Sequence, residues 1–371
     1  MHLIFTAPCI FIIFNWLWPL PIPYWLKFLL AILLLIGSQY HLWARLSSGT
    51  PMLPEFPRFL ILTFNWLFGA ITFLAFFQLV LDTATLFFVI SYRHSICIPV
   101  FFRATIGLLA AFLSACAVWN ATRLPKLRNI AVAIPNLPPE FENYTILQLA
   151  DLHLTRLFPT AWAEKVTILA NAKHADLIVI TGDFIDGPVS LRKSDIAPLK
   201  RLYAPDGVFA VPGNHEYYFN YQEWLTHLKS LDITMLLNEH TLLTRGDATL
   251  VLAGVTDLSA AHHNEQPPNL DAALKDAPAA PIVLLDHQPR NAVEAAKRKV
   301  ALQLSGHTHG GMIPGLDRLV ARANNGFVSG RYTVGAMHLY VSNGTGIWAG
   351  FALRLAKPPE ITCFQLNRTE K

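Results

Sequence analysis

The sequence predicts an α/β domain preceded by an all-α transmembrane region of about four helices. Of the 29 Lys or Arg and 25 Asp or Glu residues in the 371-residue chain, only seven precede residue 121. After that point, short apolar runs alternate with helix-like stretches, which is typical of α/β domains. Five of these runs end in Asp, Asn or His. We therefore divide the chain into a transmembrane helical region (1–122), a linker (123–143) and a domain (144–371).

The first region contains four apolar segments, at about residues 3–20, 25–43, 58 to beyond 82, and 100–120. A helix needs roughly 20 mostly apolar residues to cross the hydrocarbon core. Tryptophans lie near the expected ends, as in the aromatic belts of membrane proteins. Buried helices of a globular domain are the alternative, but they seldom remain uncharged for so long. We therefore expect the lipid bilayer to be a partner of this region.

The distribution of basic residues predicts the sidedness of the membrane region. Four spans would place both chain ends on one side of the membrane. That side would collect five basic residues and the other side three: Arg45, Arg58, Arg123, Lys126 and Arg128 against Lys27, Arg93 and Arg103. By the positive-inside rule, the C-terminal domain would be cytoplasmic.

In the linker, four prolines at 125, 135, 138 and 139 argue against one continuous helix.

Metal-competent side chains recur at the ends of apolar runs. Ligand sites in open α/β sheets lie at the carboxyl ends of the strands. One such ending would be an ordinary turn or cap, but five indicate a metal site. The runs and their terminal residues are YTILQLAD with Asp151 and then His153, DLIVITGD with Asp183, GVFAVPGNHE with Asn214 and His215, PIVLLDH with His287, and ALQLSGHTH with His307 and His309.

The spacing of His307 and His309 in GHTHGG predicts two metals rather than one. Residues two apart in an extended segment point the same way, about 6.5–7 Å apart. Metals in two-metal sites are separated by roughly 3.5–4 Å, so each imidazole can bind a different cation. The glycines around them let the backbone approach other groups closely.

These motifs resemble those of a known family. The series DLH (151–153), GD (182–183), GNHE (213–216), a single histidine at 287 and GHTHGG (306–311) resembles the metal-site motifs of the calcineurin-like metallophosphoesterase superfamily. The C-terminal stretch VSNGTGIWAGFALRLAKPPEI resembles the bacterial membrane-associated branch, although Met312 stands where that branch usually has glutamine. The resemblance implies a four-layer α/β/β/α sandwich and location in a bacterial inner membrane.

The resemblance also implies the roles of the site residues. Asp151, His153 and His309 would hold one divalent metal, and Asn214, His287 and His307 the other. Asp183 would bridge both, since a carboxylate has two oxygens. A set of nitrogen and oxygen ligands without thiolate suits Mn²⁺, Fe or Zn²⁺, and the family favours Mn²⁺.

The chemistry implied is hydrolysis of a phosphoester by a metal-bridging hydroxide. His215 follows Asn214 directly and is not needed as a ligand, so we expect it to protonate the leaving alkoxide. Glu216 would orient His215 or raise its pKa. The alternative for His215 is a hydrogen bond to a ligand carboxylate.

Membrane attachment favours a phosphodiester or pyrophosphate on a lipid or lipid-linked substrate. A UDP-2,3-diacylglucosamine pyrophosphatase of lipid A synthesis is one alternative. A non-catalytic membrane sensor or scaffold with a retained metal site is another, although all seven expected ligands and His215 are present. A nucleic-acid partner is not expected, because the net charge is only +4 and there is no basic stripe.

Overall fold

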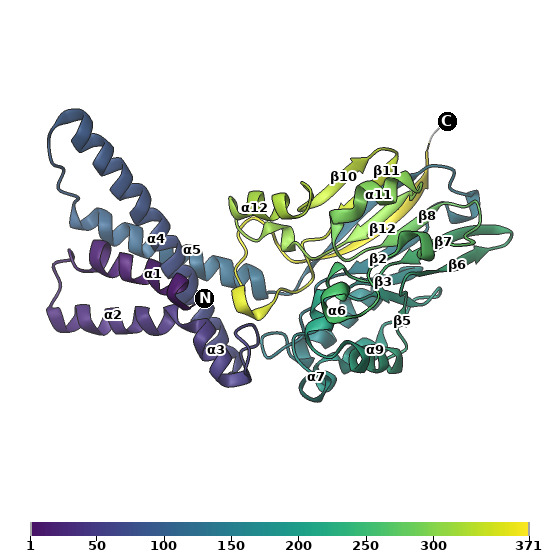
Figure 1. Cartoon of the computed structure of the whole chain (residues 1–371), viewed down its shortest axis with the longest axis horizontal. Helices are drawn as coiled ribbons and strands as arrows, with labels where there is room; N and C mark the ends of the chain where they lie inside the picture. The colour runs from purple at the N-terminus through teal and green to yellow at the C-terminus, as the bar shows by residue number, and fades with distance from the viewer. Residues whose placement is uncertain (1, 370–371) are drawn as a thin grey trace. The chain divides into compact units, whose positions relative to one another are not determined.

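The computed structural model describes residues 2–369, and the chain divides into two compact units (Figure 1). The helical unit comprises Met1–Ala121 together with Ala349–Arg354. The sheet unit comprises Thr122–Trp348 and Leu355–Lys371. The sheet unit therefore begins near residue 122 rather than at 144, and it includes the segment predicted to be a linker, 123–143.

The helical unit contains five α-helices, drawn in purple to blue in Figure 1. They are α1 (His2–Ile12), which continues as the π-helical turn η1 (Ile13–Leu17), α2 (Tyr24–Ser38), α3 (Tyr40–Ser48), α4 (Arg58–Tyr92) and α5 (Val100–Thr122). By length and composition, α4 and α5 can cross a membrane, and α2 with α3, bent by 53°, would add a third span if the pair acts as one.

The number of spans thus differs from the expected four. The first apolar stretch forms a shorter apolar helix, Thr6–Leu17. At 1.5 Å per residue, a helix of that size is about 18 Å long, whereas the hydrocarbon core is about 30 Å thick. The prolines at 19, 21 and 23 separate this helix from the next one.

A C-terminal segment, Ala349–Arg354, is built into the helical unit. The Tyr40 hydroxyl donates to the Ala349 carbonyl at 2.7 Å. The Asn65 amide donates to the same carbonyl at 3.3 Å and accepts from the Ala352 N–H at 2.8 Å. Backbone groups buried among apolar helices are costly unless they are hydrogen-bonded. The polar side chains of α3 and α4 therefore hold a segment that follows almost 300 residues later.

The sheet unit contains two six-stranded mixed sheets. The first has the order β1-β12-β2-β3-β4-β5, in which only the β12–β2 pair is antiparallel. Its strands are β1 (Lys126–Ile134), β12 (Glu360–Arg368), β2 (Thr145–Leu149), β3 (Leu177–Thr181), β4 (Val208–Val211) and β5 (Thr234–Met235).

The second sheet has the order β10-β11-β9-β8-β7-β6, with antiparallel pairs at both edges and parallel pairs between them. Its strands are β10 (Gly330–Val334), β11 (Met337–Val341), β9 (Leu302–Ser305), β8 (Ile282–Leu285), β7 (Ala248–Gly254) and β6 (Glu239–Arg245).

The two sheets pack face to face and helices cover their outer faces. Between the sheets, Ile146 and Val179 of the first share one core with Leu252 and Val283 of the second. The longer helices α6 (Thr160–Asn171), α7 (Val189–Ile196) and α9 (Tyr221–Ser230) lie on one side, and α10 (Leu270–Ala273) and α11 (Ala292–Lys297) pack on the outer face of the second sheet (Figure 1). The predicted four-layer α/β/β/α sandwich is confirmed.

Strand β1 lies within the predicted linker. Its side chains alternate between exposed and buried from Asn129 onward, and Ile130, Val132 and Ile134 face the core. Alternation of this kind is typical of an edge strand with one solvated face. The prolines at 125 and 135 flank the strand and do not interrupt it, so the linker is in fact part of the first sheet.

Candidate metal centre

Four of the expected ligands occupy equivalent places after their strands. Asp151 follows β2, Asp183 follows β3, His287 follows β8 and His307 follows β9, each two residues beyond the strand. Asn214 comes after β4 and begins the short helix α8 (Asn214–Tyr218). Because β2, β3 and β4 run parallel in one sheet and β8 and β9 parallel in the other, these side chains meet where both sheets end.

Five of the seven expected ligands have a left-handed backbone. Their φ values are 51° at Asp151, 45° at His153, 55° at Asp183, 70° at His307 and 50° at His309. This conformation costs a residue other than glycine roughly 1–2 kcal/mol. Such strain is concentrated at functional sites, where the surrounding structure enforces it. The backbone thus turns sharply at each of these residues, which aims their side chains into a shared space.

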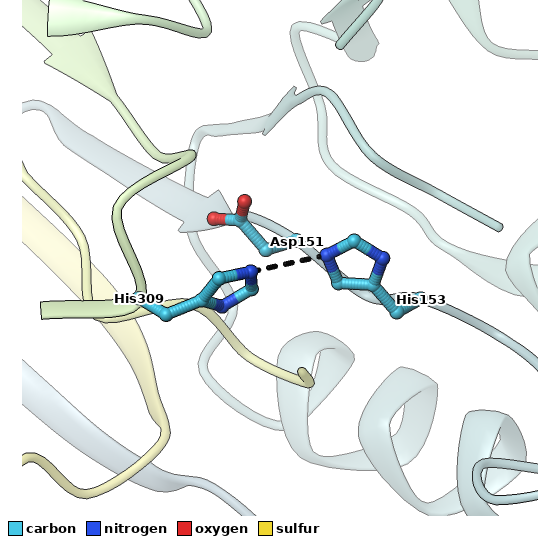
Figure 2. A group of neighbouring side chains, drawn as sticks. All are labelled: Asp151, His153 and His309. Carbon is cyan, nitrogen blue, oxygen red and sulfur yellow. Dashed lines mark hydrogen bonds between the residues drawn. The ribbon is translucent and has the colours of Figure 1, made fainter. Parts of the chain in front are cut away.

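The first cluster consists of Asp151, His153 and His309, whose ligand atoms all lie within 4.8 Å of one another (Figure 2). The Nε2 atoms of the two histidines are 3.2 Å apart. One oxygen of Asp151, Oδ1, accepts from the His307 N–H at 2.8 Å. The other, Oδ2, is buried and has no hydrogen-bond partner in the described chain, which leaves it available to a cation.

The second cluster consists of Asp183, His287 and His307, with Asn214 beside them. The Asn214 carbonyl oxygen is 3.1 Å from Nε2 of His287 and 2.9 Å from Nδ1 of His307. Oδ2 of Asp183 is 3.3 Å from Nε2 of His287 and also 3.6 Å from Nε2 of His153, in the first cluster. One carboxylate oxygen therefore lies between the two groups.

The hydrogen bonds of His287 show that the site suits cations. Its Nδ1 lies 2.7 Å from the Thr181 carbonyl, which only accepts, so Nδ1 carries a proton. In the neutral ring, Nε2 is then an acceptor, and it faces the oxygens of Asp183 and Asn214, which also accept. Only a proton or a cation makes this arrangement favourable. His287 is fully buried, and a divalent metal is the chemical match for such a set of donors.

The pKa values of Asp183 and His287 also indicate a site that favours positive charge. Burial opposes ionisation of Asp183, but the charges of His287 and His215 hold its pKa well below the ordinary value. Burial also opposes protonation of His287, yet Asp183 and Asp151 raise its pKa well above the ordinary value. The Asp183 carboxylate is thus ionised and draws positive charge to the centre, whereas burial raises the pKa of Asp151 above its ordinary value.

His215 is held by Asp186, a residue that the pattern of strand ends does not predict. Oδ1 of Asp186 contacts Nδ1 of both His215 and His153. Burial alone would lower the pKa of His215, but Asp183 and Asp186 raise it to about 9. The sequence does contain a feature that indicates Asp186 as a site residue, because it lies only three residues after Asp183 in GDFID.

Glu216 contacts backbone rather than the imidazole of His215. Its carboxylate accepts from the N–H groups of Gly213 at 2.7 Å, Asp183 at 3.0 Å and Phe184 at 2.8 Å. Burial and the neighbouring Asp183 raise its pKa to about 8. Glu216 therefore fixes the loop after β3 against the GNHE loop, and its effect on His215 is electrostatic.

A second group missed in the sequence lies in the loop after β11. The Thr345 N–H donates to the Ala150 carbonyl at 2.6 Å, and the Gly346 N–H donates to the Asp151 carbonyl at 2.9 Å. Gly344 has a φ of +84°, and a Cβ there would lie 3.1 Å from both Asp151 and His309. The hydrogen bonds of this loop therefore hold the backbone at Ala150 and Asp151, and so help to position the carboxylate that Asp151 contributes to the first cluster.

Comparison with known proteins places the chain in a family. A model described as calcineurin-like phosphoesterase matches residues 144–311. A Bos taurus transmembrane protein with metallophosphoesterase domain is 34% identical over 271 residues, which are 69% of this chain and 60% of that protein. A metallophosphoesterase of Campylobacter jejuni is 32% identical over 277 residues, 74% of this chain and 72% of that protein. The chain belongs to the calcineurin-like metallophosphoesterase family.

The share of each relative that the chain covers differs among the metallophosphoesterases that it matches. One from Helicobacter pylori is 35% identical over 246 residues, which are 65% of this chain and 64% of the relative. The chain thus spans less than two thirds of the Helicobacter and bovine proteins. Metallophosphoesterases use dinuclear metal centres, and the two clusters, with Asp183 of the second lying 3.6 Å from His153 of the first, are the candidate ligand groups for one.

Proposed function

We propose that this protein is a membrane-anchored phosphoesterase with a dinuclear metal centre, which hydrolyses a phosphodiester or pyrophosphate on a lipid or lipid-linked substrate. The observation that supports it best is the position of the Asp183 carboxylate between the two clusters. Cations held on both sides of this carboxylate would supply the fixed positive charge that phosphoester hydrolysis needs, because negative charge develops on the phosphoryl oxygens.

Two divalent cations would be held by the seven residues named from the sequence. Asp151, His153 and His309 would hold one, Asn214, His287 and His307 the other, and Asp183 both. When bound, such cations lower the pKa of water toward about 7 and neutralise phosphoryl charge. Ligands of nitrogen and oxygen alone suit Mn²⁺, Fe or Zn²⁺, and membership of the family favours Mn²⁺ among them.

The proton for the leaving group would come from His215. Its Nδ1 faces Asp186, so the imidazole is held in one orientation, with Nε2 toward the centre, 3.9 Å from Oδ2 of Asp183. Burial opposes protonation of the ring, but Asp183 and Asp186 raise its pKa, which favours the protonated form that a proton donor needs. The ring is mostly buried, which limits exchange of this proton with bulk water.

The membrane helices support the choice of substrate class. With α4 and α5 in the chain, the enzyme would work at the headgroup layer, where phosphoesters of lipids are concentrated. We further propose that it resides in a bacterial inner membrane with the sheet unit in the cytoplasm, on the basis of the five basic residues on that side of the expected spans.

Metal analysis joined to an activity assay tests the proposal. Full-length protein in lipid nanodiscs should contain about two divalent metals per chain by elemental analysis. It should hydrolyse bis(4-nitrophenyl) phosphate, lose this activity with a chelator and regain it with Mn²⁺. Two bound metals without turnover of any phosphoester would instead support the sensor or scaffold alternative, and a metal-free protein would contradict both.

A further inference from the structure

A cavity of about 270 Å³ opens beside the candidate metal centre. His307 and His309 form one wall, and Met312, Val320 and Trp348 contribute apolar side chains to the others. Both histidines belong to the groups that would hold the metals. A phosphoryl group bound at the centre would therefore have the rest of its molecule next to this cavity.

The position of the cavity depends on helix α12 (Leu316–Ala323), which packs against the GHTHGG loop. Gly311 has a φ of +76°, and a Cβ at this position would collide with Asp317 in the first turn of α12. The Asp317 carboxylate accepts from the Gly315 N–H at 2.8 Å, which ties down the turn before the helix. The last glycine of the motif thus allows α12 to approach the loop that carries both histidines.

Helix α12 is amphipathic, and none of its residues is buried. Leu316, Val320 and Ala323 are spaced so that they fall on one face, while Arg318 and Arg322 lie away from it. Val320 and Ala323 line the cavity. A helix with an apolar face that is not covered by the rest of its own fold is suited to bind an apolar ligand.

We propose that this cavity binds the alkyl chain of the substrate, immediately next to the phosphoryl group. The inference rests on the proposed function and specifies which part of a lipid-linked phosphoester the enzyme recognises. Pockets that enclose a whole drug-sized ligand measure roughly 300–1,000 Å³, so a cavity of about 270 Å³ suits part of one chain and not an entire lipid. The cavity is continuous with the two histidines, so we expect its occupant to be part of the molecule bound at the metal centre and not a protein partner.

A series of substrates that differ only in chain length tests the proposal. The probes are 4-nitrophenyl phosphodiesters whose second ester group is methyl, butyl or octyl, assayed with full-length protein in nanodiscs containing Mn²⁺. Complete burial of one methylene favours binding by about fourfold. We expect kcat/KM to rise at least tenfold from methyl to octyl, mainly through KM. Equal kcat/KM for methyl and octyl esters would overturn the subsite.

Variants of α12 separate the cavity from general partition into lipid. Val320→Asp places a charge in the cavity wall and should reduce the octyl-to-methyl ratio of kcat/KM toward one. Leu319→Asp is the matched control: it makes the same kind of change in the same helix, but Leu319 is 59% exposed and does not line the cavity. It should keep the wild-type ratio. A lowered ratio in both variants would mean that partition, and not the cavity, causes the chain-length effect.

A variant that fills the cavity and a measurement of ligand binding keep the proposal testable if Val320→Asp misfolds or the protein proves inactive. Ala323→Phe starts from an exposed position and should fill the cavity, so that the octyl preference falls while the thermal unfolding temperature stays unchanged. Titration calorimetry with octylphosphonate and methylphosphonate reports binding without turnover. Stronger binding of octylphosphonate in a protein that hydrolyses nothing would overturn the proposed function alone. Turnover without any chain dependence would overturn the subsite alone.

Discussion

The carboxylate of Asp186 contacts Nδ1 of His153 at 3.2 Å. The same oxygen contacts Nδ1 of His215. One carboxylate thus fixes the orientation of an expected metal ligand and of the expected proton donor. Burial would raise the pKa of Asp186, but the charges of His153 and His215 hold it at about 2. Asp186 is therefore ionised throughout the physiological range and keeps the Nε2 atom of each ring directed at the centre.

Removal of this charge should affect metal binding and catalysis together. Asp186→Asn keeps the shape but weakens the hold on both imidazoles, so we expect metal affinity or kcat to fall about 10–100-fold. Elemental analysis across a range of free Mn²⁺ and steady-state kinetics with bis(4-nitrophenyl) phosphate measure the two effects. Wild-type values for both would show that the contact has no functional role.

Replacement of His215 should separate chemistry from metal binding. His215→Ala removes the proposed acid but no proposed ligand, so both metals should remain while kcat falls by about 10²–10⁴-fold for alkyl leaving groups. The loss should be smallest for 4-nitrophenyl esters, because their leaving group needs no proton. Loss of a metal in this variant would instead identify His215 as a ligand.

Replacement of Asp183 should remove both metals in one step. Asp183→Ala deletes the oxygen that lies near the histidines of both clusters, so we expect the metal content to fall from about two per chain to near zero. Asp247→Asn, in the exposed turn between β6 and β7, is the control and should keep full metal content. A protein that retains one metal after loss of Asp183 would contradict the shared position of this carboxylate.

A pH-dependent contribution to stability is expected far from the metal centre. The Asp176 carboxylate accepts from the Thr145 N–H at 2.8 Å and pairs with Arg245 at 2.8 Å. Burial would raise its pKa, but these partners lower it below the ordinary value. A depressed pKa in the folded state stabilises the protein above the unfolded pKa of about 3.9, and this stabilisation is lost as pH falls through the folded value.

Asp176→Asn should therefore destabilise the protein by about 1.5–3 kcal/mol at pH 7, the range for hydrogen bonds to charged groups. The difference from wild type should shrink as pH falls below about 4, because the unfolded chain then takes up a proton that the folded carboxylate, with its lower pKa, still resists. Thermal unfolding between pH 7 and pH 3.5 measures this. A constant difference over the whole range would show that the charge of Asp176 is not the cause.

The Ala349–Arg354 segment should contribute to the stability of the helical unit. Asn65→Leu leaves the Ala352 N–H without its acceptor in a buried position, which costs about 1–3 kcal/mol. Asn15→Leu, on the exposed face of η1, is the matched control and should change the unfolding temperature little. Similar unfolding temperatures for the Asn65 variant and the wild type would contradict the role of this hydrogen bond.

The sequence alone identified the features that depend on neighbours in the chain. Hydropathy located the apolar helices, and short buried runs located β2, β3, β4, β8 and β9. The residues just after those strands were sufficient to name the seven side chains that the structure brings together. This was possible because strand periodicity and the position of a strand end are local properties of a sequence.

Only the tertiary structure decided the features that join distant segments. Strand β1 pairs with β12, more than 200 residues away, and the proline-rich surroundings concealed it. The role of Asp186 comes from its contacts with His153 and His215, which lie 33 and 29 residues away in the chain. The cavity beside α12 and the place of Ala349–Arg354 among the helices likewise depend on close packing. Close packing and buried hydrogen bonds form between whichever groups the fold brings near, and these groups can be far apart in the chain. The local pattern of a sequence can therefore show one member of such a contact but not its partner.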